Sequence, residues 1–341
     1  MTRTFKVAIV GASGVVGETL IRVLEERDFP VGELFALASE RSIGKKLRFR
    51  DADVAVDDLA AFDFRRAEIA FFSAGGAVSR EYAPAAAAAG CIVIDNTSEF
   101  RYENDVPLVV PEVNPQEIAK YTNRGIIANP NCSTIQMVVA LKPIYDIAGI
   151  ERINVATYQA VSGAGRKAVA ELAVQSAQLL GGQGPVEAHV IAKQIAFNCV
   201  PQIDVFQENG YTREEMKMVW ETQKIMADPR ILVNATCVRV PVFFGHSEAL
   251  HVETRSKITA QQARAVLAKA PGVKVMDERK PGGYPTAATE AANRDTVYVG
   301  RIREDISIAR GLNLWLVADN VRKGAATNSI QIAEILVREH I

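Results

Sequence analysis

Apolar and polar positions alternate along the first third of the chain in the way that βαβ units do. Short apolar runs are separated by segments whose apolar residues recur at helical spacing, as Val16, Leu20, Val23 and Leu24 do. This pattern is typical of a parallel sheet with helices on its faces, the doubly wound nucleotide-binding fold. The predicted strands are residues 5–10, 34–37, 69–72, 92–94 and 126–128.

After about Asn129 the pattern changes, because longer strand-like runs occur among longer helical segments. The predicted strands are residues 153–161, 236–244, 250–256, 296–302 and 312–317, and the predicted helices are residues 167–180, 213–226, 261–270 and 327–339. Such a mixture favours an α+β domain with a mixed or antiparallel sheet. We therefore expect an α/β chain with a Rossmann-like dinucleotide-binding domain over residues 1–128 and an α+β domain over residues 129–320.

The composition is that of an ordinary globular protein. With 48% hydrophobic and 23% charged residues, a chain of 341 residues can form two cores, and we expect it to be folded throughout. The net charge of −1 gives no basic surface for nucleic acid, and no apolar run approaches the ~20 residues that cross a bilayer. We expect a cytoplasmic protein without nucleic-acid or membrane partners. The four cysteines and four histidines form no cluster of ligand spacing, which predicts no bound metal.

A glycine-rich turn follows the first predicted strand and opens the first predicted helix. Its order, Gly-x-x-Gly-x-x-Gly, lets the backbone approach a pyrophosphate, whose charge the positive end of the helix would meet. The residues predicted to hold a dinucleotide here are Gly11, Ala12, Ser13, Gly14, Val15 and Val16. The alternative is a turn that needs glycines for its geometry only. Ser73 and Gly75, at the end of the third strand, form either a second approach to the cofactor or a plain strand-to-helix turn.

The residues after the second predicted strand would distinguish NADP from NAD. Arg41, flanked by Ser39 and Ser42, suits the 2′-phosphate of NADP. Glu40 could instead accept a hydrogen bond from the free 2′-hydroxyl of NAD. The arginine and its serines favour NADP.

Cys132 is the candidate nucleophile. It follows a predicted strand and precedes apolar residues at helical spacing, so it would begin a helix. The positive end of a helix lowers the pKa of a thiol from its usual ~8.5 and makes the nucleophilic thiolate available near neutral pH. The alternative is a structural cysteine. Cys91, Cys199 and Cys237 lie in apolar strand-like contexts, which predicts that they are buried core residues.

A thiolate mechanism needs a proton acceptor, and His246 and His251 are the candidates. His251 lies inside a strand pattern, whereas His246 comes at a strand end, where sites are often built. Arg239 lies in an apolar strand and should face a cleft or an acidic partner, because an unpaired buried cation is costly. Gln159 ends a strand-like run, and its amide could bind the reacting carbonyl.

Several motifs resemble those of the aspartate-semialdehyde dehydrogenase family, and they occur in family order along nearly the whole chain. They are the glycine turn, Asn-Pro-Asn-Cys-Ser-Thr at 129–134, Tyr-Gln-Ala-Val-Ser-Gly-Ala-Gly at 158–165, Glu-Glu-Met-Lys at 214–217, Asp-Asn at 319–320 and Lys-Gly-Ala-Ala at 323–326. The resemblance implies an NADP-dependent dehydrogenase whose domain at 129–320 serves catalysis and dimerisation, with the C-terminal helix at 321–341 packed on the first domain. It also implies a homodimer or homotetramer.

The resemblance implies roles for individual residues as well. The implied catalytic residues are Cys132, His246 and Gln159. Arg239, seven residues before the base, would bind the substrate carboxylate, and Glu214 would bind the substrate amino group. The implied phosphate pocket consists of Arg101, Lys217 and the amide of Asn131. The residues implied to lie near the nicotinamide and its carboxamide are Ser162, Gly163 and Asn320.

The implied reaction is the reversible reductive dephosphorylation of aspartyl β-phosphate to aspartate semialdehyde, in lysine, threonine and methionine biosynthesis. Cys132 would displace phosphate and NADPH would deliver hydride to the thioester; in reverse, His246 would remove a proton from the thiohemiacetal. One alternative is N-acetyl-γ-glutamyl-phosphate reductase, whose substrate lacks the free amino group that a Glu214 and Arg239 pair suits. The other is an NADP-binding sensor without catalysis, which would need no aligned Cys132, Gln159 and His246.

Overall fold

The structure is a computed structural model that describes residues 3–341. The chain divides into two compact units. The first unit extends to Asn131 and resumes at Ala325–Ile341, and the second unit is Cys132–Gly324. Within residues 3–341, no helix is both long and apolar enough to span a bilayer.

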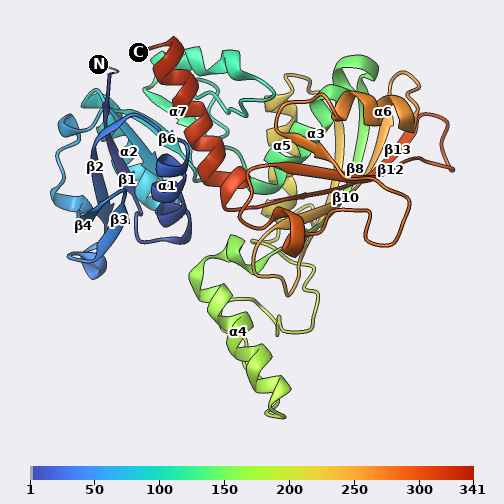
Figure 1. Ribbon diagram of the computed structural model, residues 1–341, viewed down its shortest axis with the longest axis horizontal. Coiled ribbons are helices and arrows are strands. Elements are labelled where there is room, and N and C mark those ends of the chain that lie inside the picture. Colours follow the sequence, from blue (N-terminus) through green and yellow to red (C-terminus); the bar gives the residue numbers. More distant parts are fainter. Residues whose placement is uncertain (1–2) are drawn as a thin grey trace. The chain divides into compact units, whose positions relative to one another are not determined.

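The first unit is built on a seven-stranded sheet flanked by helices (Figure 1). Its strand order is β3-β4-β2-β1-β5-β6-β7, and every pairing except that of β3 with β4 is parallel. The strands are β1 Phe5–Val10, β2 Val31–Ala38, β3 Lys46–Phe49, β4 Ala52–Asp58, β5 Ile69–Phe72, β6 Ile92–Asp95 and β7 Ile126–Ala128. The helices are α1 Val15–Glu26, α2 Gly76–Ala88 and the C-terminal α7 Thr327–Glu339. All five strands expected in this region are present, and the doubly wound α/β fold is confirmed.

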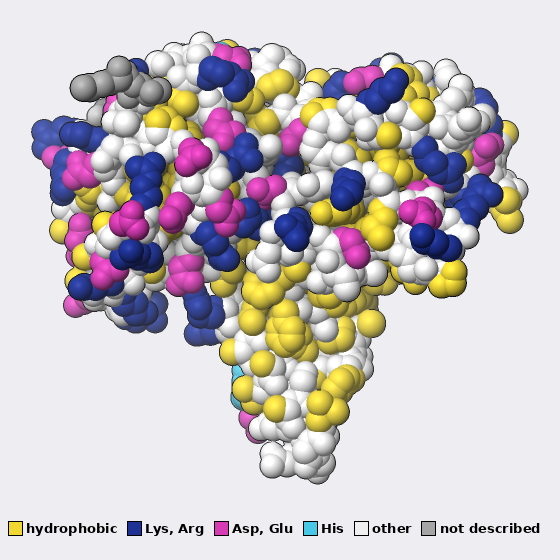
Figure 2. Space-filling model, in the orientation of Figure 1, with side chains coloured by type: hydrophobic (Ala, Val, Ile, Leu, Met, Phe, Trp, Pro, Cys, Tyr) yellow, Lys and Arg dark blue, Asp and Glu magenta, His cyan; other side chains and the backbone are white. Residues whose placement is uncertain are grey.

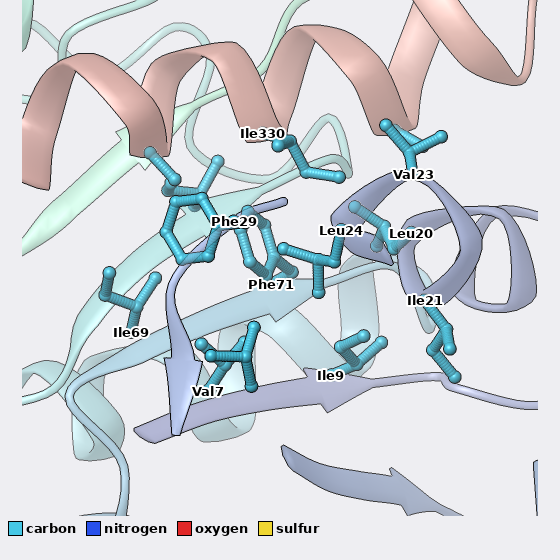
Figure 3. Packing of buried hydrophobic residues seen from close by; sticks show 14 of the residues in the cluster. Val7, Ile9, Leu20, Ile21, Val23, Leu24, Phe29, Ile69, Phe71 and Ile330 are labelled. Atoms are coloured by element: carbon cyan, nitrogen blue, oxygen red, sulfur yellow. The ribbon is translucent and has the colours of Figure 1, made fainter. Parts of the chain in front are cut away.

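The core of the first unit joins β1, α1 and the returning C-terminal helix. Figure 3 shows side chains from these elements pointing into one cluster, in which Ile9, Leu24 and Ile330 are fully buried. The apolar face of α1 recurs at helical spacing, so the same residues that predict the helix also supply its buried side. Burying each such side chain contributes about 1.5–3 kcal/mol. The chain returns to the first unit because α7 completes this core.

The second unit is an α+β structure with a mixed six-stranded sheet in the order β11-β12-β13-β10-β8-β9 (Figure 1). β8 with β9 and β11 with β12 are parallel, and the other pairings are antiparallel. The strands are β8 Ile150–Gln159, β9 Leu232–Arg239, β10 His246–Thr254, β11 Val273–Val275, β12 Val297–Glu304 and β13 Gly311–Ala318. The helices are α3 Cys132–Ala148, α4 Arg166–Leu180, α5 Arg213–Ile225 and α6 Ala260–Leu267. α3 packs against β8, β10, β12 and β13, and it is the central cover of the sheet.

The expected strand at 236–244 is wrong in its second half. β9 ends at Arg239, residues 240–245 form a loop, and β10 begins at His246. Pro241 has no N–H to give to a sheet, so the apolar run cannot continue as a paired strand. His246 consequently lies at the start of a strand, directly after the loop, and Arg239 lies at the end of another strand.

Candidate active site

Strand register places three polar side chains side by side at one end of the second sheet. Gln159, the last residue of β8, pairs with Arg239, the last residue of β9. Tyr158 pairs with Ser247 of β10, so His246 is the next neighbour of Gln159 on the other side. Side chains of paired residues share a face of the sheet, and all three are nearly inaccessible to solvent. We call Arg239, Gln159 and His246 the catalytic row.

The Gln159 amide is held on both sides. Its Oε1 accepts a hydrogen bond from Thr157 Oγ1 at 2.9 Å, and its Nε2 donates to Glu214 Oε1 at 3.1 Å. The amide nitrogen also lies 3.5 Å from His246 Nε2. These contacts fix the orientation of the Gln159 amide inside the row.

His246 is fully buried and electrically neutral. Burial, together with the charge of Arg239, lowers the pKa of His246 to about 3. The backbone N–H of Ala160 donates to Nδ1 at 3.0 Å, so the single ring proton lies on Nε2. The ring nitrogen nearest Gln159 is therefore a hydrogen-bond donor.

Glu214 and Lys217 form a buried ion pair beside the row. They lie one turn apart on α5, and Lys217 Nζ donates to Glu214 Oε2 and to Asp204 Oδ2, both at 2.9 Å. Burial alone would lower the pKa of Lys217, but the two carboxylates raise it above its usual value. The first turn of α5 is fixed by a capping box in which Thr212 and Glu215 bond each other's backbone N–H groups.

Arg239 is the second cation of the site. Its Nη1 donates to the Ala160 carbonyl at 2.7 Å. Burial lowers the pKa of Arg239, while the nearby Glu214 and Cys132 oppose that shift. Arg239 thus interacts electrostatically with both the Glu214 carboxylate and the Cys132 thiol.

Cys132 begins α3 and is partly exposed. Gly324 lies directly against it, since a Cβ added at Gly324 would come within 2.8 Å of the Cys132 Cβ. Cys91 and Cys237 are buried, as expected, and burial raises the pKa of the Cys91 thiol to about 12 and that of Cys237 well above its usual value. The expectation that Cys199 is a core residue is wrong, because it is exposed in a loop outside any strand.

Ser162, Gly163 and Asn320 gather next to the row. The Ser162 hydroxyl and the Asn320 side chain exchange hydrogen bonds at 3.0 and 3.1 Å, and Asn320 Oδ1 also accepts from the Gly245 N–H at 2.9 Å. A Cβ at Gly163 would lie 3.0 Å from Arg239 Nη1 and 3.5 Å from the His246 ring. Gly163 therefore leaves no free space between the backbone and these two side chains.

Apart from Ser162, Gly163 and Asn320, the residues expected to hold the cofactor belong to the first unit, and several of them are also brought together. Gly11 has a φ of +90°, and a Cβ there would come within 3.0 Å of the Ser73 and Ala74 backbone. Ser13 Oγ donates to Ser42 Oγ at 3.1 Å, so the glycine turn and the segment after β2 meet. The turn lies at the carboxyl end of β1, beside which the strand order reverses, and Gly14 caps α1 without a side-chain hydrogen bond.

These features fit a dinucleotide. The crevice beside a reversal of strand order is where doubly wound sheets bind nucleotides. An α1 terminus without a side-chain cap leaves its N–H groups available to a phosphate. Ser39 and Arg41 are exposed around the short helix Glu40–Ser42, and Gly75, directly before α2, has a φ of +101° and open space where a Cβ would be.

Two of the expected phosphate ligands, Arg101 and Asn131, also belong to the first unit. Both are buried, and Arg101 Nη2 donates to the Asn96 carbonyl at 2.9 Å. Lys217 belongs to the second unit, so a joint role of the three in binding phosphate stays a prediction. Among residues 3–341, no group of three or more His, Cys, Asp or Glu side chains is placed to hold a metal ion.

Sequence reasoning missed the polar residues that lie one step below the catalytic row. Thr157 precedes Gln159 by two positions and Glu248 follows His246 by two, so both share the buried face of the row. Counting in steps of two from Gln159 and His246 along their strands would have pointed to them. The strand predicted over residues 153–161 contains both Thr157 and Gln159, so Thr157 could have been found in this way. The predicted strands contained neither His246 nor Glu248, so Glu248 could not.

Comparisons with known proteins agree with this architecture. The family model described as "Semialdehyde dehydrogenase, NAD binding domain" matches residues 6–121, and the one described as "Semialdehyde dehydrogenase, dimerisation domain" matches residues 141–323. The aspartate-semialdehyde dehydrogenase of Legionella pneumophila is 63% identical over 341 residues, covering 100% of this chain and 98% of that protein.

Solved structures give the same result. The crystal structure of aspartate semialdehyde dehydrogenase II from Vibrio cholerae, complexed with ASA, has a TM-score of 0.98 and 60% identity, with 100% of both chains covered. The aspartate semialdehyde dehydrogenase of Candida albicans, solved with NADP, has a TM-score of 0.76 and 26% identity and covers 98% of this chain and 99% of that one. The chain therefore belongs to the aspartate-semialdehyde dehydrogenase family.

Proposed function

We propose that this protein converts L-aspartyl 4-phosphate to L-aspartate 4-semialdehyde, reversibly and with NADPH, through a thioester on Cys132. It is an NADP-dependent oxidoreductase of amino-acid biosynthesis, on the route to lysine, threonine and methionine. The observation that carries this proposal is the position of a partly exposed thiol at the start of α3, in a unit whose sheet ends in the buried row of Arg239, Gln159 and His246.

Cys132 is the nucleophile in this proposal. A thiolate at the first residue of α3 is stabilised by the positive end of the helix and by the nearby charge of Arg239. Attack of the sulfur on the acyl carbon forms a thioester and releases phosphate with the electron pair of the broken C–O bond. The buried thiols of Cys91 and Cys237 are protonated near neutral pH, because burial raises their pKa, so they do not compete.

NADPH, when bound, supplies the hydride that reduces the thioester carbonyl. Reduction places negative charge on the carbonyl oxygen, and the Nε2–H of His246 and the Gln159 amide are the donors available to it. The alkoxide then expels the Cys132 thiolate and leaves the aldehyde. Because Ala160 donates to Nδ1, we assign His246 to bind this alkoxide through Nε2–H, in place of the proton-accepting role expected from the sequence.

Arg239 and Glu214 suit the two ends of an amino-acid substrate. A guanidinium binds a carboxylate through two parallel hydrogen bonds, and Arg239 is the guanidinium of the row. Glu214 would bind the ammonium group, since it is a buried acid in contact with Gln159. Lys217, with Arg101 and the Asn131 amide, is assigned to phosphate. An N-acetylated substrate has no ammonium group for Glu214, which argues against N-acetyl-γ-glutamyl-phosphate reductase.

The first unit would hold NADP. The backbone of the glycine turn, with Ser13 and the N–H groups that open α1, would bind the pyrophosphate. Ser39, Arg41 and Ser42 would bind the 2′-phosphate, because an exposed guanidinium with two hydroxyl groups matches a dianion better than a free hydroxyl. In the second unit, Ser162, Gly163 and Asn320 would bind the nicotinamide and its carboxamide.

The proposed assembly is a homodimer formed through the second unit, in the cytoplasm, with a tetramer as the larger alternative. Large hydrophobic side chains of this unit are exposed on and after α4, among them Val174, Leu180 and Phe197. Figure 2 shows hydrophobic side chains gathered around the region of α4. Apolar surface of this kind is commonly buried between subunits.

A steady-state assay with aspartate semialdehyde, phosphate and either NADP or NAD tests substrate and cofactor together. We expect turnover with NADP, and none when N-acetylglutamate semialdehyde replaces the substrate. Cys132→Ala should abolish turnover and leave NADP binding intact, whereas Cys199→Ala, at the exposed cysteine, should retain the activity of the wild type. Substantial activity of Cys132→Ala would refute the thioester mechanism.

A further inference from the structure

A carboxylic acid that the reaction does not use lies directly below the catalytic row. Glu248 is fully buried on β10, two residues after His246 and therefore on the same face of the sheet. Its paired neighbours are Thr157 of β8 and Leu316 of β13. Thr157 is the residue that donates to the Gln159 amide, so Glu248 adjoins the support of the row.

Within residues 3–341, neither carboxyl oxygen of Glu248 has a partner at hydrogen-bond distance. An ionised carboxylate would not remain unpaired in such a place, and burial accordingly raises the pKa of Glu248 well above its usual range. Glu248 is thus a neutral acid with one O–H to donate. A polar group buried at this cost calls for an explanation beyond packing.

The helix that begins with Cys132 supplies the complementary group. Gln136 lies one turn after Cys132 on α3 and is buried, and neither of its amide atoms is at hydrogen-bond distance from a partner in the described part of the chain. α3 packs on β10, and the Gln136 side chain opposes the rise in the Glu248 pKa that burial causes. A protonated carboxyl and a carboxamide can satisfy each other through two hydrogen bonds, O–H to C=O and N–H to C=O.

We propose that Glu248 is a positioning residue, which as a neutral acid pairs with Gln136 and so fixes the start of α3, with Cys132, against the strand that begins with His246. The contact between Glu248 and Gln136 lies one helical turn from Cys132 and two strand positions from His246. It therefore fixes the position of the nucleophile relative to the imidazole. This role rests on the proposed function of Cys132 and His246. Displacement of a reacting group by ~1 Å can lower the rate by ~100-fold. A buried polar contact that prevents such a displacement of Cys132 therefore favours the reaction.

Three variants test the proposal. Glu248→Gln keeps the shape and the hydrogen bonding without a titratable group, and its kcat should stay within roughly threefold of the wild type. Glu248→Leu and Gln136→Leu keep much of the volume but cannot pair, and their kcat should fall by ~10-fold or more with the KM for aspartate semialdehyde little changed. The double Leu variant should lose no more than either single variant, because both remove the same contact.

Two further measurements separate positioning from simple structural support. The melting temperature of the double Leu variant should equal or exceed that of the wild type, since two apolar side chains replace a buried polar pair, although its kcat falls. The rate at which iodoacetamide alkylates Cys132 should change in the Leu variants and not in Glu248→Gln, and this readout needs no substrate. Wild-type kcat in Glu248→Leu would overturn the proposal, as would loss of activity in Glu248→Gln. Failure of the wild type to turn over aspartate semialdehyde would instead refute the proposed function.

Discussion

Gly163 shows how little room separates the residues of the site. No side chain fits there without displacing Arg239, whose guanidinium lies 3.0 Å from the position of an added Cβ, and the His246 ring is only 3.5 Å away. Both neighbours are buried and held by backbone groups of Ala160, so neither can move freely. Glycine is needed at residue 163 because a Cβ would be too close to these neighbours, and not because the backbone has a positive φ there.

Gly163→Ala should therefore lower kcat/KM for aspartate semialdehyde by ~10-fold or more, because the added methyl group displaces Arg239 and crowds the His246 ring, so that neither keeps its position beside the substrate. Gly181→Ala is the matched control: it also adds a methyl group at a glycine of the second unit, on the exposed end of α4. It should keep the kcat/KM of the wild type. Equal activity in both variants would mean that the spacing at Gly163 has no part in the reaction.

At this scale, sequence singled out Cys132, Gln159, Arg239 and His246, and the structure places the last three in one row. Motif resemblance could select them because residue type and order suffice for that. It could not select Thr157 or Glu248, whose importance depends on which side chains lie beside them. Cys199 was misjudged because an apolar local context does not reveal that the segment is an exposed loop.

Among the elements, α5 carries the acid and the lysine of the site in its first two turns, and the position of both residues depends on how the helix begins. Thr212 and Glu215 form a capping box there, and Thr259 and Gln262 form the same motif at the start of α6. The two helices therefore begin with the same capping box, but only α5 carries site residues beside it.

Thr212→Ala should reduce stability by about 1 kcal/mol and raise the KM for aspartate semialdehyde severalfold, because Glu214 and Lys217 lose their fixed turn. Thr259→Ala should cost a similar amount of stability and leave the KM unchanged. Thermal melts and initial-rate kinetics on both variants check this. A KM that rises equally in the two variants would show that only general stability is involved.

The elements themselves were predicted best where their pattern is strong. The buried strands of the first unit and the amphipathic helices appear where apolar spacing places them. The hairpin of β3 and β4 was not predicted. It lies at the edge of the sheet, and its exposed charged residues interrupt the alternation of apolar and polar positions that identifies a strand. The end of β9 was misplaced because the residues from 236 to 244 are mostly apolar, a pattern that predicts one strand. Pro241 and Gly245 interrupt that strand.

For the whole molecule, the two-unit α/β architecture could be predicted because the change of pattern after the first third is clear. The fold as a whole also carries the cost of a buried neutral histidine. Because the pKa of His246 falls to about 3 on folding, the unfolded chain binds this proton first as the pH decreases. His246 therefore removes stability as the pH falls from about 6.5 toward 3, by ~1.4 kcal/mol per pH unit.

His246→Asn should lose less stability than the wild type between pH 7 and pH 5, by up to ~2 kcal/mol, since asparagine does not titrate. Urea unfolding at the two pH values measures the difference. Other acids contribute equally to both proteins and cancel in the comparison. Parallel losses in the two proteins would show that His246 is not the neutral, buried group described here.

The catalytic row also bears on which insertions and deletions such a chain can tolerate. Its three members are aligned by hydrogen-bonded pairing along β8, β9 and β10, whereas residues 240–245 connect two of these strands and bond the loop after β8. A residue gained or lost in that connection would leave the pairing of the three strands unchanged. A residue gained within β8 would turn either Gln159 or its support Thr157 to the opposite side of the sheet, so length variation should be confined to the joints between strands.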